Sequence, residues 1–234
     1  MVEGHGRWRG QPAIANADTL RQACGLPPPL TGEEWAANFI YRALRPGDAK
    51  DEPMSDQLSA AITIRPAQGQ DVAALDALLV ASFSAPAEAA LVRDLCVEGD
   101  MVLMLVAINE ATDGLIGAIA FSRMAVEIGG KPINSVALAP IAVARDWRQQ
   151  GVGEALVAAG LERLEKEGVV LCFALGDPAF YGRFGFAADV ASGFDSPYAG
   201  DYFLAAPLQG GLIPCGVRGA ATHAPAFARL GDAA

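Results

Sequence analysis

Hydrophobic residues in the segment 61–128 recur with two different spacings, and each spacing predicts a type of element. Ile62 and Ile64 alternate with polar residues, which is typical of a short strand. Leucine and valine then recur at intervals of three and four residues, which predicts a helix, and Pro86 suits the first turn of a second helix. Two apolar runs separated by turn residues predict a β-hairpin. The predicted elements are strands at 62–65, 101–108 and 115–128 and helices at 71–83 and 86–96.

The second half of the chain contains the clearest helical pattern, over 151–167. Its apolar positions form one stripe, charged residues occupy the other positions, and Gly168 follows as a C-cap. Pro140 interrupts a predicted strand at 133–143 and predicts a bulge or an edge, because proline cannot donate to the ladder. The remaining predicted elements are a buried strand at 169–175, a short helix at 179–183 and a C-terminal strand region within 211–226. Hairpins and crossovers in one chain predict an α+β (mixed α/β) fold.

Residues 1–60 differ in composition from the rest of the chain. They contain three consecutive prolines at 27–29 and a charged run over 45–56. One segment, 31–44, has helical spacing and a capping box formed by Thr31 and Glu34, so it is a candidate docking helix. We therefore predict an N-terminal extension over 1–60 and a domain over 61–234. The segment that begins at Met54 resembles an ordinary protein N-terminus, which is consistent with this boundary.

The overall composition excludes several functional classes. The 234 residues are 52% hydrophobic and 19% charged, which is too apolar for a disordered chain. The 17 basic and 27 acidic residues give a net charge of −10, which argues against nucleic acid and is compatible with a cationic substrate. No apolar stretch approaches the length of a membrane helix, and the N-terminus lacks a secretory signal. We expect a soluble cytoplasmic protein that uses neither membrane nor nucleic acid.

Histidines and cysteines give no indication of a metal site. The chain has two histidines, one near each end, and four cysteines without C-x-x-C spacing. A multi-histidine zinc site is therefore not expected. Cys96 and Cys172 lie among apolar neighbours in the sequence and are predicted to be inert buried thiols. His223 lies in a Gly/Ala-rich segment and is predicted to be exposed.

The segment between the predicted strand at 133–143 and the following helix carries the main chemical signal. It reads Arg148-Gln149-Gln150-Gly151-Val152-Gly153. Glycines at a helix start allow close approach of a ligand, and the first-turn N–H groups suit a phosphate. The dinucleotide fingerprint fails because Leu156 occupies the third glycine position, and neither a phosphate-binding G-x-x-x-x-G-K-[ST] loop nor a G-x-S-x-G elbow is present.

Two motifs together resemble GNAT-type N-acetyltransferases, which use acetyl-CoA. The first is Arg148-x-x-Gly151-x-Gly153, which is similar to the family's [QR]-x-x-G-x-[GA] signature. The second is the segment 176–186, GDPAFYGRFGF, which resembles a G-D-P-x-[FY]-Y-x-R-F-G-F segment of a bacterial subgroup. The resemblance covers about 61–230. It implies a central mixed, mostly antiparallel sheet flanked by helices.

The resemblance also implies how acetyl-CoA would be held, without any metal. Backbone N–H groups of the glycine-containing loop would bind the pyrophosphate. The end of the preceding strand would bind the pantetheine arm, and one of its N–H groups would face the thioester oxygen. The implied cofactor-binding residues are Ile141, Ala142, Val143, Arg148, Gln149, Gln150, Gly151, Val152, Gly153, Glu154 and Asp177.

Two residues are candidates for catalysis, and each has an alternative structural role. Tyr181 matches the tyrosine that protonates the leaving thiolate in the family, and the resemblance favours this role over the packing aromatic that the residues alone would suggest. Glu127 could act as base or amine anchor, or it could be a solvated glutamate at a strand end. Asp177 could cap the short helix instead of contacting the cofactor. Arg183 could contact the cofactor or lie on the surface.

The resemblance implies an enzyme that acetylates a primary amine of a small molecule or a protein. One alternative is a catalytically silent acetyl-CoA-binding sensor, and another is a generic phosphate-binding α/β protein. The acceptor amine cannot be identified from the sequence. Oligomeric state stays open, with a homodimer as one alternative because similar proteins often form dimers.

Overall fold

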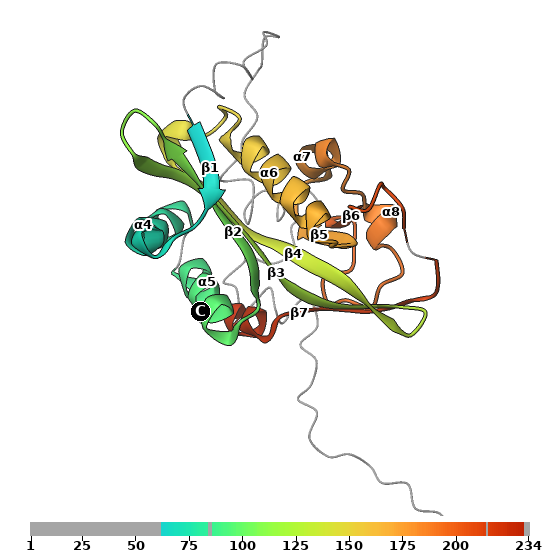
Figure 1. The fold of residues 1–234 in the computed structure, drawn as a ribbon. Coiled ribbons are helices and arrows are strands. Elements are labelled where there is room, and N and C mark those ends of the chain that lie inside the picture. The colour runs from blue at the N-terminus through green and yellow to red at the C-terminus, as the bar shows by residue number, and fades with distance from the viewer. Residues whose placement is uncertain (1–61, 84–85, 214, 232–234) are drawn as a thin grey trace, which may run out of the picture.

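A computed structural model describes residues 62–83, 86–213 and 215–231 (Figure 1). The predicted extension over 1–60, its docking helix at 31–44 and the start at Met54 lie outside the described residues. The described part is built on a seven-stranded sheet flanked by helices. This confirms the predicted α+β fold with a mixed, mostly antiparallel sheet.

The sheet has the strand order β1-β2-β3-β4-β5-β6, and β7 pairs with the far end of β3. All neighbouring strands are antiparallel except β4 and β5, which are parallel. A parallel pair needs a crossover, and a helix between β4 and β5 supplies it. The strands are β1 Ile62–Pro66, β2 Met101–Asn109, β3 Gly114–Ile128, β4 Lys131–Val143, β5 Leu171–Leu175, β6 Phe203–Pro207 and β7 Arg218–His223.

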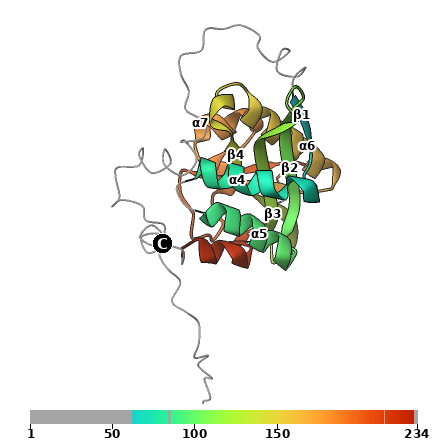
Figure 2. The same cartoon turned by 90° about the vertical axis from the view of Figure 1, so that its left-hand side faces the viewer.

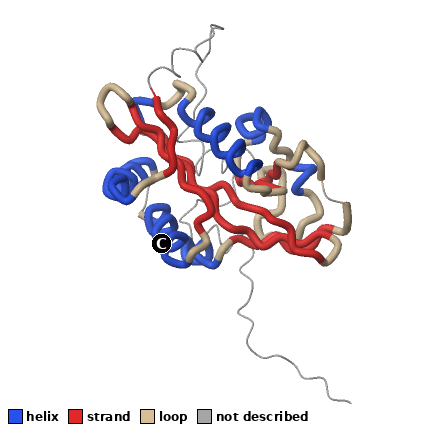
Figure 3. The backbone as a smooth tube through the Cα atoms, in the orientation of Figure 1, coloured by secondary structure: helices blue, strands red, loops and turns tan. Residues whose placement is uncertain are grey.

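The helices cover both faces of the sheet (Figures 1 and 2). Helices α4 (Val72–Ser82) and α5 (Ala87–Glu98) lie on one face, and α6 (Val152–Lys166) lies on the other. The tube in Figure 3 shows these helices flanking the strands. The shorter elements are η2 Gly69–Asp71, η3 Arg145–Trp147, α7 Pro178–Tyr181, η4 Gly182–Phe184, α8 Ala188–Ala191 and η5 Pro225–Gly231.

Side chains of β3 alternate between the two helical layers, as a pleated strand requires. Ile119 and Phe121 pack in the cluster that contains residues of α6, whereas Ala118 and Ala120 pack with α4 and α5. Helix α6 approaches the sheet closely at Gly160, where an added Cβ would lie 2.4 Å from the Phe121 ring. This close contact fixes the position of α6, and therefore of its N-terminus, against the central strands.

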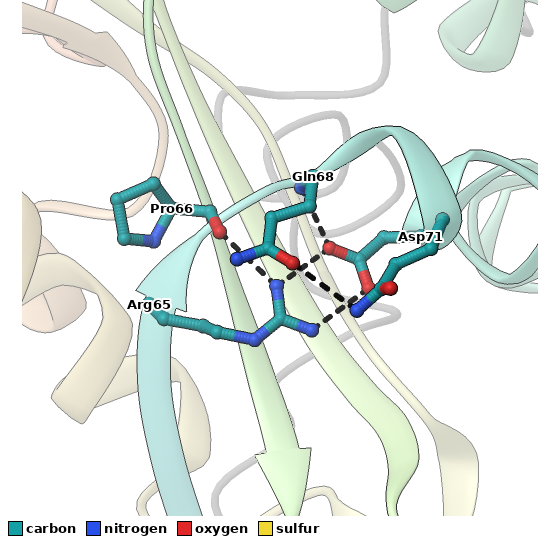
Figure 4. A network of polar contacts seen from close by, with 5 residues as sticks. Arg65, Pro66, Gln68 and Asp71 are labelled. Atoms are coloured by element: carbon teal, nitrogen blue, oxygen red, sulfur yellow. Dashed lines mark hydrogen bonds and ion pairs between the residues drawn. The ribbon is translucent and has the colours of Figure 1, made fainter.

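An ion pair connects β1 to the start of α4 (Figure 4). Arg65 Nη1 and Nη2 donate to Asp71 Oδ2 and Oδ1 at 2.6 and 2.9 Å, and the Gln68 backbone N–H donates to Asp71 Oδ2 at 2.7 Å. The hydrogen bonds from Arg65 are the main reason that the pKa of the Asp71 carboxyl is lowered. Asp71 therefore stays ionised next to Arg65 and holds the turn between the two elements.

The structure corrects two predictions about single residues. Cys172 is buried as predicted, but Cys96 is exposed, because it lies on the outer side of α5. His223 is not exposed as predicted: its ring packs at 4.9 Å from both Tyr198 and Phe227, and its Nδ1 atom is buried. Burial lowers the pKa of His223 to about 4. The Gly/Ala-rich sequence around His223 gave no sign of these aromatic neighbours.

Candidate functional site

Strands β4 and β5 separate in the middle of the sheet. Ser135–Leu138 pair with Leu171–Ala174, and the pairing ends there, although β4 continues to Val143. At the same point β4 contains a bulge, because Leu138 opposes Phe121 whereas Ile141 opposes Ile119. The bulge contains Ala139 and Pro140, so the bulge predicted from Pro140 is confirmed. We call the opening between the end of β4 and β5 the fork.

The backbone of the predicted pantetheine segment faces the fork. The Ala144 N–H donates to Ile116 O of β3 at 2.8 Å. Because antiparallel pairs alternate, Ala142 also bonds toward β3, and Ile141 and Val143 direct their N–H and C=O groups to the other edge. Strand β4 no longer pairs with β5 at these residues. An extended chain with amide groups could bond along this edge as an additional strand.

The loop after β4 presents backbone N–H groups at the start of α6. Gln149 and Gly151 have positive φ values of 62° and 80°, and such left-handed residues let successive N–H groups turn toward one concave surface. Gly151 is the N-cap of α6 and has no side-chain acceptor, so the N–H groups of Val152, Gly153 and Glu154 point out of the helix start. The positive end of the helix dipole adds to the attraction for an anion. This geometry fits a pyrophosphate.

Two further contacts hold the loop in place. Arg148 Nε donates to Val143 O at 3.1 Å, which joins the loop to the end of β4. Gln150 Nε2 donates to Asp146 O at 2.6 Å and closes the turn. Burial and the nearby Arg145 lower the pKa of Arg148, but a guanidinium remains charged. The end of β4, which borders the fork, therefore leads directly into the loop whose geometry fits a pyrophosphate.

Arg183 connects α6 to the segment after β5. Its Nη2 lies 3.3 Å from Glu154 Oε1, and its guanidinium lies 4.9 Å from the centre of the Phe180 ring. Arg183 partly neutralises the Glu154 carboxylate, which would otherwise repel an anion at this helix start. The structure thus places Arg183 beside the predicted cofactor loop.

Asp177 begins α7. Its Oδ1 accepts a hydrogen bond from the Ala179 N–H at 2.8 Å, which confirms the predicted helix cap. A contact between Asp177 and the cofactor stays a prediction. Because α7 starts directly after β5, the cap fixes how the following aromatic residues enter the core.

Tyr181, the predicted acid, is 1% exposed at the end of α7. Its ring packs against Phe180 and Phe186, with centroid distances of 4.9 and 5.5 Å. Burial, with a smaller effect of Cys172, raises the pKa of the Tyr181 hydroxyl. The tyrosine therefore keeps its proton at neutral pH, which a general acid requires. Its packing role is observed, and its catalytic role stays a prediction.

Glu127, the other catalytic candidate, lies at the opposite end of the hairpin. It opposes Pro132 at the start of β4, whereas the predicted pantetheine residue Ile141 opposes Ile119. The eight residues from Ile119 to Glu127 correspond to about 26 Å along the strand. The structure therefore does not bring Glu127 together with the cofactor-binding candidates.

The sequence analysis did not single out Glu88, in the first turn of α5. Only 9% of the residue is exposed, and its Oε2 atom has no hydrogen-bond partner among the described residues. Burial raises the pKa of the Glu88 carboxyl. An acidic residue in the first turn of a helix is ordinary in a sequence, so no local signal distinguishes this one.

Comparisons with known proteins agree with this geometry. A sequence profile described as "Acetyltransferase (GNAT) domain" matches residues 63–188. The uncharacterized N-acetyltransferase YhbS of Escherichia coli (strain K12) is 43% identical over 116 residues, which are 50% of this chain and 68% of YhbS.

Two solved structures have a similar fold. The crystal structure of E. coli YhbS in complex with CoA has a TM-score of 0.65 and 32% identity, covering 78% of this chain and 97% of YhbS. A GNAT family acetyltransferase from Brucella melitensis in complex with acetyl-CoA has a TM-score of 0.55 and 27% identity, covering 71% of this chain and 97% of that one. Within the described residues, no helix combines the length and apolar character needed to span a membrane.

Proposed function

The chain belongs to the GNAT family of N-acetyltransferases, and from this premise we propose that it transfers the acetyl group of acetyl-CoA to a primary amine by direct attack. The acceptor is an amine of a small molecule or of a protein. One observation carries the proposal: the open edge of β4 leads directly into a loop and helix start that present backbone donors. The CoA and acetyl-CoA complexes of the two similar structures support it.

The chain's own groups would hold acetyl-CoA in two places. Backbone N–H groups from Gln149 to Glu154 bind the pyrophosphate, and Arg148 contributes a positive charge beside it. The outward N–H groups of Ile141 and Val143 and the C=O group of Ile141 bond the amides of the pantetheine arm. The thioester then lies in the fork.

The transfer itself needs stabilisation of an oxyanion and a proton for the leaving group. An N–H on the open edge of β4 donates to the carbonyl oxygen as negative charge develops there. The amine nitrogen bonds to the carbonyl carbon, the carbon–sulfur bond breaks, and Tyr181 donates its hydroxyl proton to the thiolate. The buried Tyr181 hydroxyl is protonated at neutral pH, as this step requires.

Calorimetry with acetyl-CoA, followed by thiol release with a panel of amines and mass detection of the acetylated product, tests the proposal. We expect binding and amine-dependent thiol release. Tight binding without turnover on any amine would instead favour a silent acetyl-CoA sensor. The absence of both binding and a thermal shift with CoA would contradict the cofactor assignment.

A further inference from the structure

Helix α4 turns an apolar surface to solvent. A helix on the outside of a domain normally has apolar residues toward the core and polar residues outside. The buried residues of α4 are leucines, but its exposed residues are all alanine or valine, whereas α6 exposes Glu162 and Lys166. We call this exposed surface the α4 face. It consists of Val72, Ala73, Ala74, Ala77, Val80 and Ala81.

No charge interrupts the α4 face. Asp76 is the single charged residue of α4, and its Oδ1 accepts a hydrogen bond from Arg93 Nη1 of α5 at 3.2 Å, so the carboxylate is directed toward α5. Ala73, Ala77 and Ala81 are four residues apart and therefore lie on one side of the helix. In Figure 2 α4 lies toward the viewer, and no described helix or strand passes in front of it. A contiguous apolar surface of this kind marks an interaction site, unlike single exposed apolar residues.

The predicted docking helix at 31–44, which lies outside the described residues, has the complementary pattern. Its apolar residues follow helical spacing, and Tyr41 falls on the other side. Large side chains on one helix fill the space over small residues on another. A helix of this length is marginal alone in water, so it needs such a surface, and at about 21 Å it is long enough to cover the 11 residues of α4. The apolar side of the segment consists of Trp35, Phe39, Ile40 and Leu44.

The connection between this segment and the domain is long enough for docking within one chain. The hydrogen bond from Arg65 Nη1 to Asp71 Oδ2, at 2.6 Å, places the start of α4 beside the end of β1. The lengths of β1 and α4 add up to about 30 Å. Residues 45–61 can span up to about 56 Å when extended, so the segment 31–44 reaches every part of the α4 face. Such a tether raises the effective concentration of the segment, an advantage that a second copy of the chain lacks.

We propose that residues 31–44 dock as a helix on the α4 face of the same chain. The large apolar side chains of the segment lie against the alanines of α4, and its polar side faces solvent. Docking is independent of the proposed acetyl transfer and concerns how the N-terminal extension joins the domain. The leucines of α4 already pack against the sheet without the segment. Docking therefore adds stability to the fold without being required for it.

The test uses the full chain with two matched pairs of substitutions. Phe39→Ala removes a ring from the docking side of the segment, and Tyr41→Ala removes one from the opposite side. Ala77→Gln places a bulky polar side chain on the α4 face, and Ala158→Gln makes the same change at an exposed position of α6. The double variant Phe39→Ala/Ala77→Gln completes a cycle. Thermal unfolding followed by circular dichroism gives the melting temperatures, and analytical ultracentrifugation gives the mass in solution.

We expect Phe39→Ala and Ala77→Gln each to lower the melting temperature by about 4 °C or more, and their controls to lower it by less than about 2 °C. The double variant should lose less than the sum of the two single losses, because both substitutions remove the same contact. Ala77→Gln and Ala158→Gln are the decisive pair, since both alanines are exposed in the described structure and only docking distinguishes them.

Three results would overturn the docking proposal. The first is an equal melting temperature for Ala77→Gln and Ala158→Gln, and the second is an additive loss in the double variant. The third is a dimeric parent that Ala77→Gln makes monomeric and Phe39→Ala does not, which would assign the α4 face to a second copy of the chain.

Discussion

Single side chains make the stability of this protein dependent on pH. Asp71 has a lowered pKa because of Arg65, so the folded state holds this carboxylate ionised at a pH where an unfolded chain begins to protonate it. The contribution of Asp71 to the free energy of unfolding is therefore complete above its pKa in the unfolded chain, about 3.9. This contribution is lost as the pH falls through the lower pKa of Asp71 in the folded protein.

The first prediction follows from this pair. Asp71→Asn should lower the melting temperature near neutral pH and should flatten its fall between about pH 5 and pH 2, because the variant has no carboxylate to protonate. Thermal unfolding followed by circular dichroism over this range measures the effect. Asp201→Asn, at an exposed turn position, is the matched control and should keep the parent's pH dependence. Identical pH profiles for Asp71→Asn and the parent would show that the pair does not stabilise the fold.

A second prediction at this scale concerns the Tyr181 hydroxyl. The thiol of coenzyme A resembles cysteine, with a pKa of about 8.5, so the thiolate can leave without full protonation. Tyr181→Phe keeps the ring between Phe180 and Phe186 and removes only the hydroxyl. We expect kcat to fall by at least about tenfold, toward the lower end of general-acid effects, and the acetyl-CoA dissociation constant to stay unchanged.

Steady-state kinetics and calorimetry check this outcome. The loss should be smaller with a thioester whose leaving group is more acidic. Parent turnover by Tyr181→Phe would assign the proton transfer to another group and leave Tyr181 with packing alone.

At the scale of elements, the site depends on the end of β4, the loop after it and the first turn of α6. The loop needs a left-handed backbone conformation at Gly151, which a residue with a side chain adopts only at a cost in free energy. The same backbone requirement exists at Gly129, with a φ of 59°, in the distant β3–β4 turn, where an added Cβ meets nothing within 4 Å.

These two glycines give a matched pair of variants. Gly151→Val and Gly129→Val should both lower the melting temperature, because each places a β-branched residue at positive φ. Only Gly151→Val should weaken acetyl-CoA binding, by about tenfold or more if one phosphate contact of about 1.4 kcal/mol is lost. Calorimetry at a temperature where both variants are folded measures this difference. Equal affinities would contradict the phosphate-binding assignment of the loop.

At the scale of the whole molecule, the described residues contain the sheet, both helical layers and the candidate site. The matched family region, 63–188, begins at β1. We therefore expect a chain that begins at Met54 to fold and to bind acetyl-CoA as the full chain does. Gel filtration, circular dichroism and calorimetry compare the two chains. An insoluble or non-binding product would assign part of residues 1–53 to the functional unit.

The elements that the sequence predicted are those with a strong local pattern. The helices at 71–83, 86–96 and 151–167 and the β-hairpin need only the periodicity of their own apolar residues, and the structure contains them all. The short helix α8 and the turn η5 have little periodicity of their own and were not predicted.

Long-range packing explains the errors about single residues. His223 is covered by Tyr198 and by Phe227 of η5, neither of which its own segment identifies as a neighbour. Glu88 lies in the first turn of α5, which packs against α4, β2 and η5, and η5 lies near the other end of the chain. The sequence places Glu127 at the end of its strand, just before the turn at Gly129, but only the register of β3 with β4 shows that Ile141 opposes Ile119, far from that turn.

The bulge and the fork also divide the amide protons of β4 into two groups that exchange with solvent at different rates. Ala142 and Ala144 bond to β3, whereas the N–H groups of Ile141 and Val143 point into the fork. Deuterium should therefore replace the protons of Ile141 and Val143 quickly in the free protein and those of Ala142 and Ala144 slowly. Bound acetyl-CoA would slow the first pair alone, so every second amide of this short segment reports directly on occupancy of the fork.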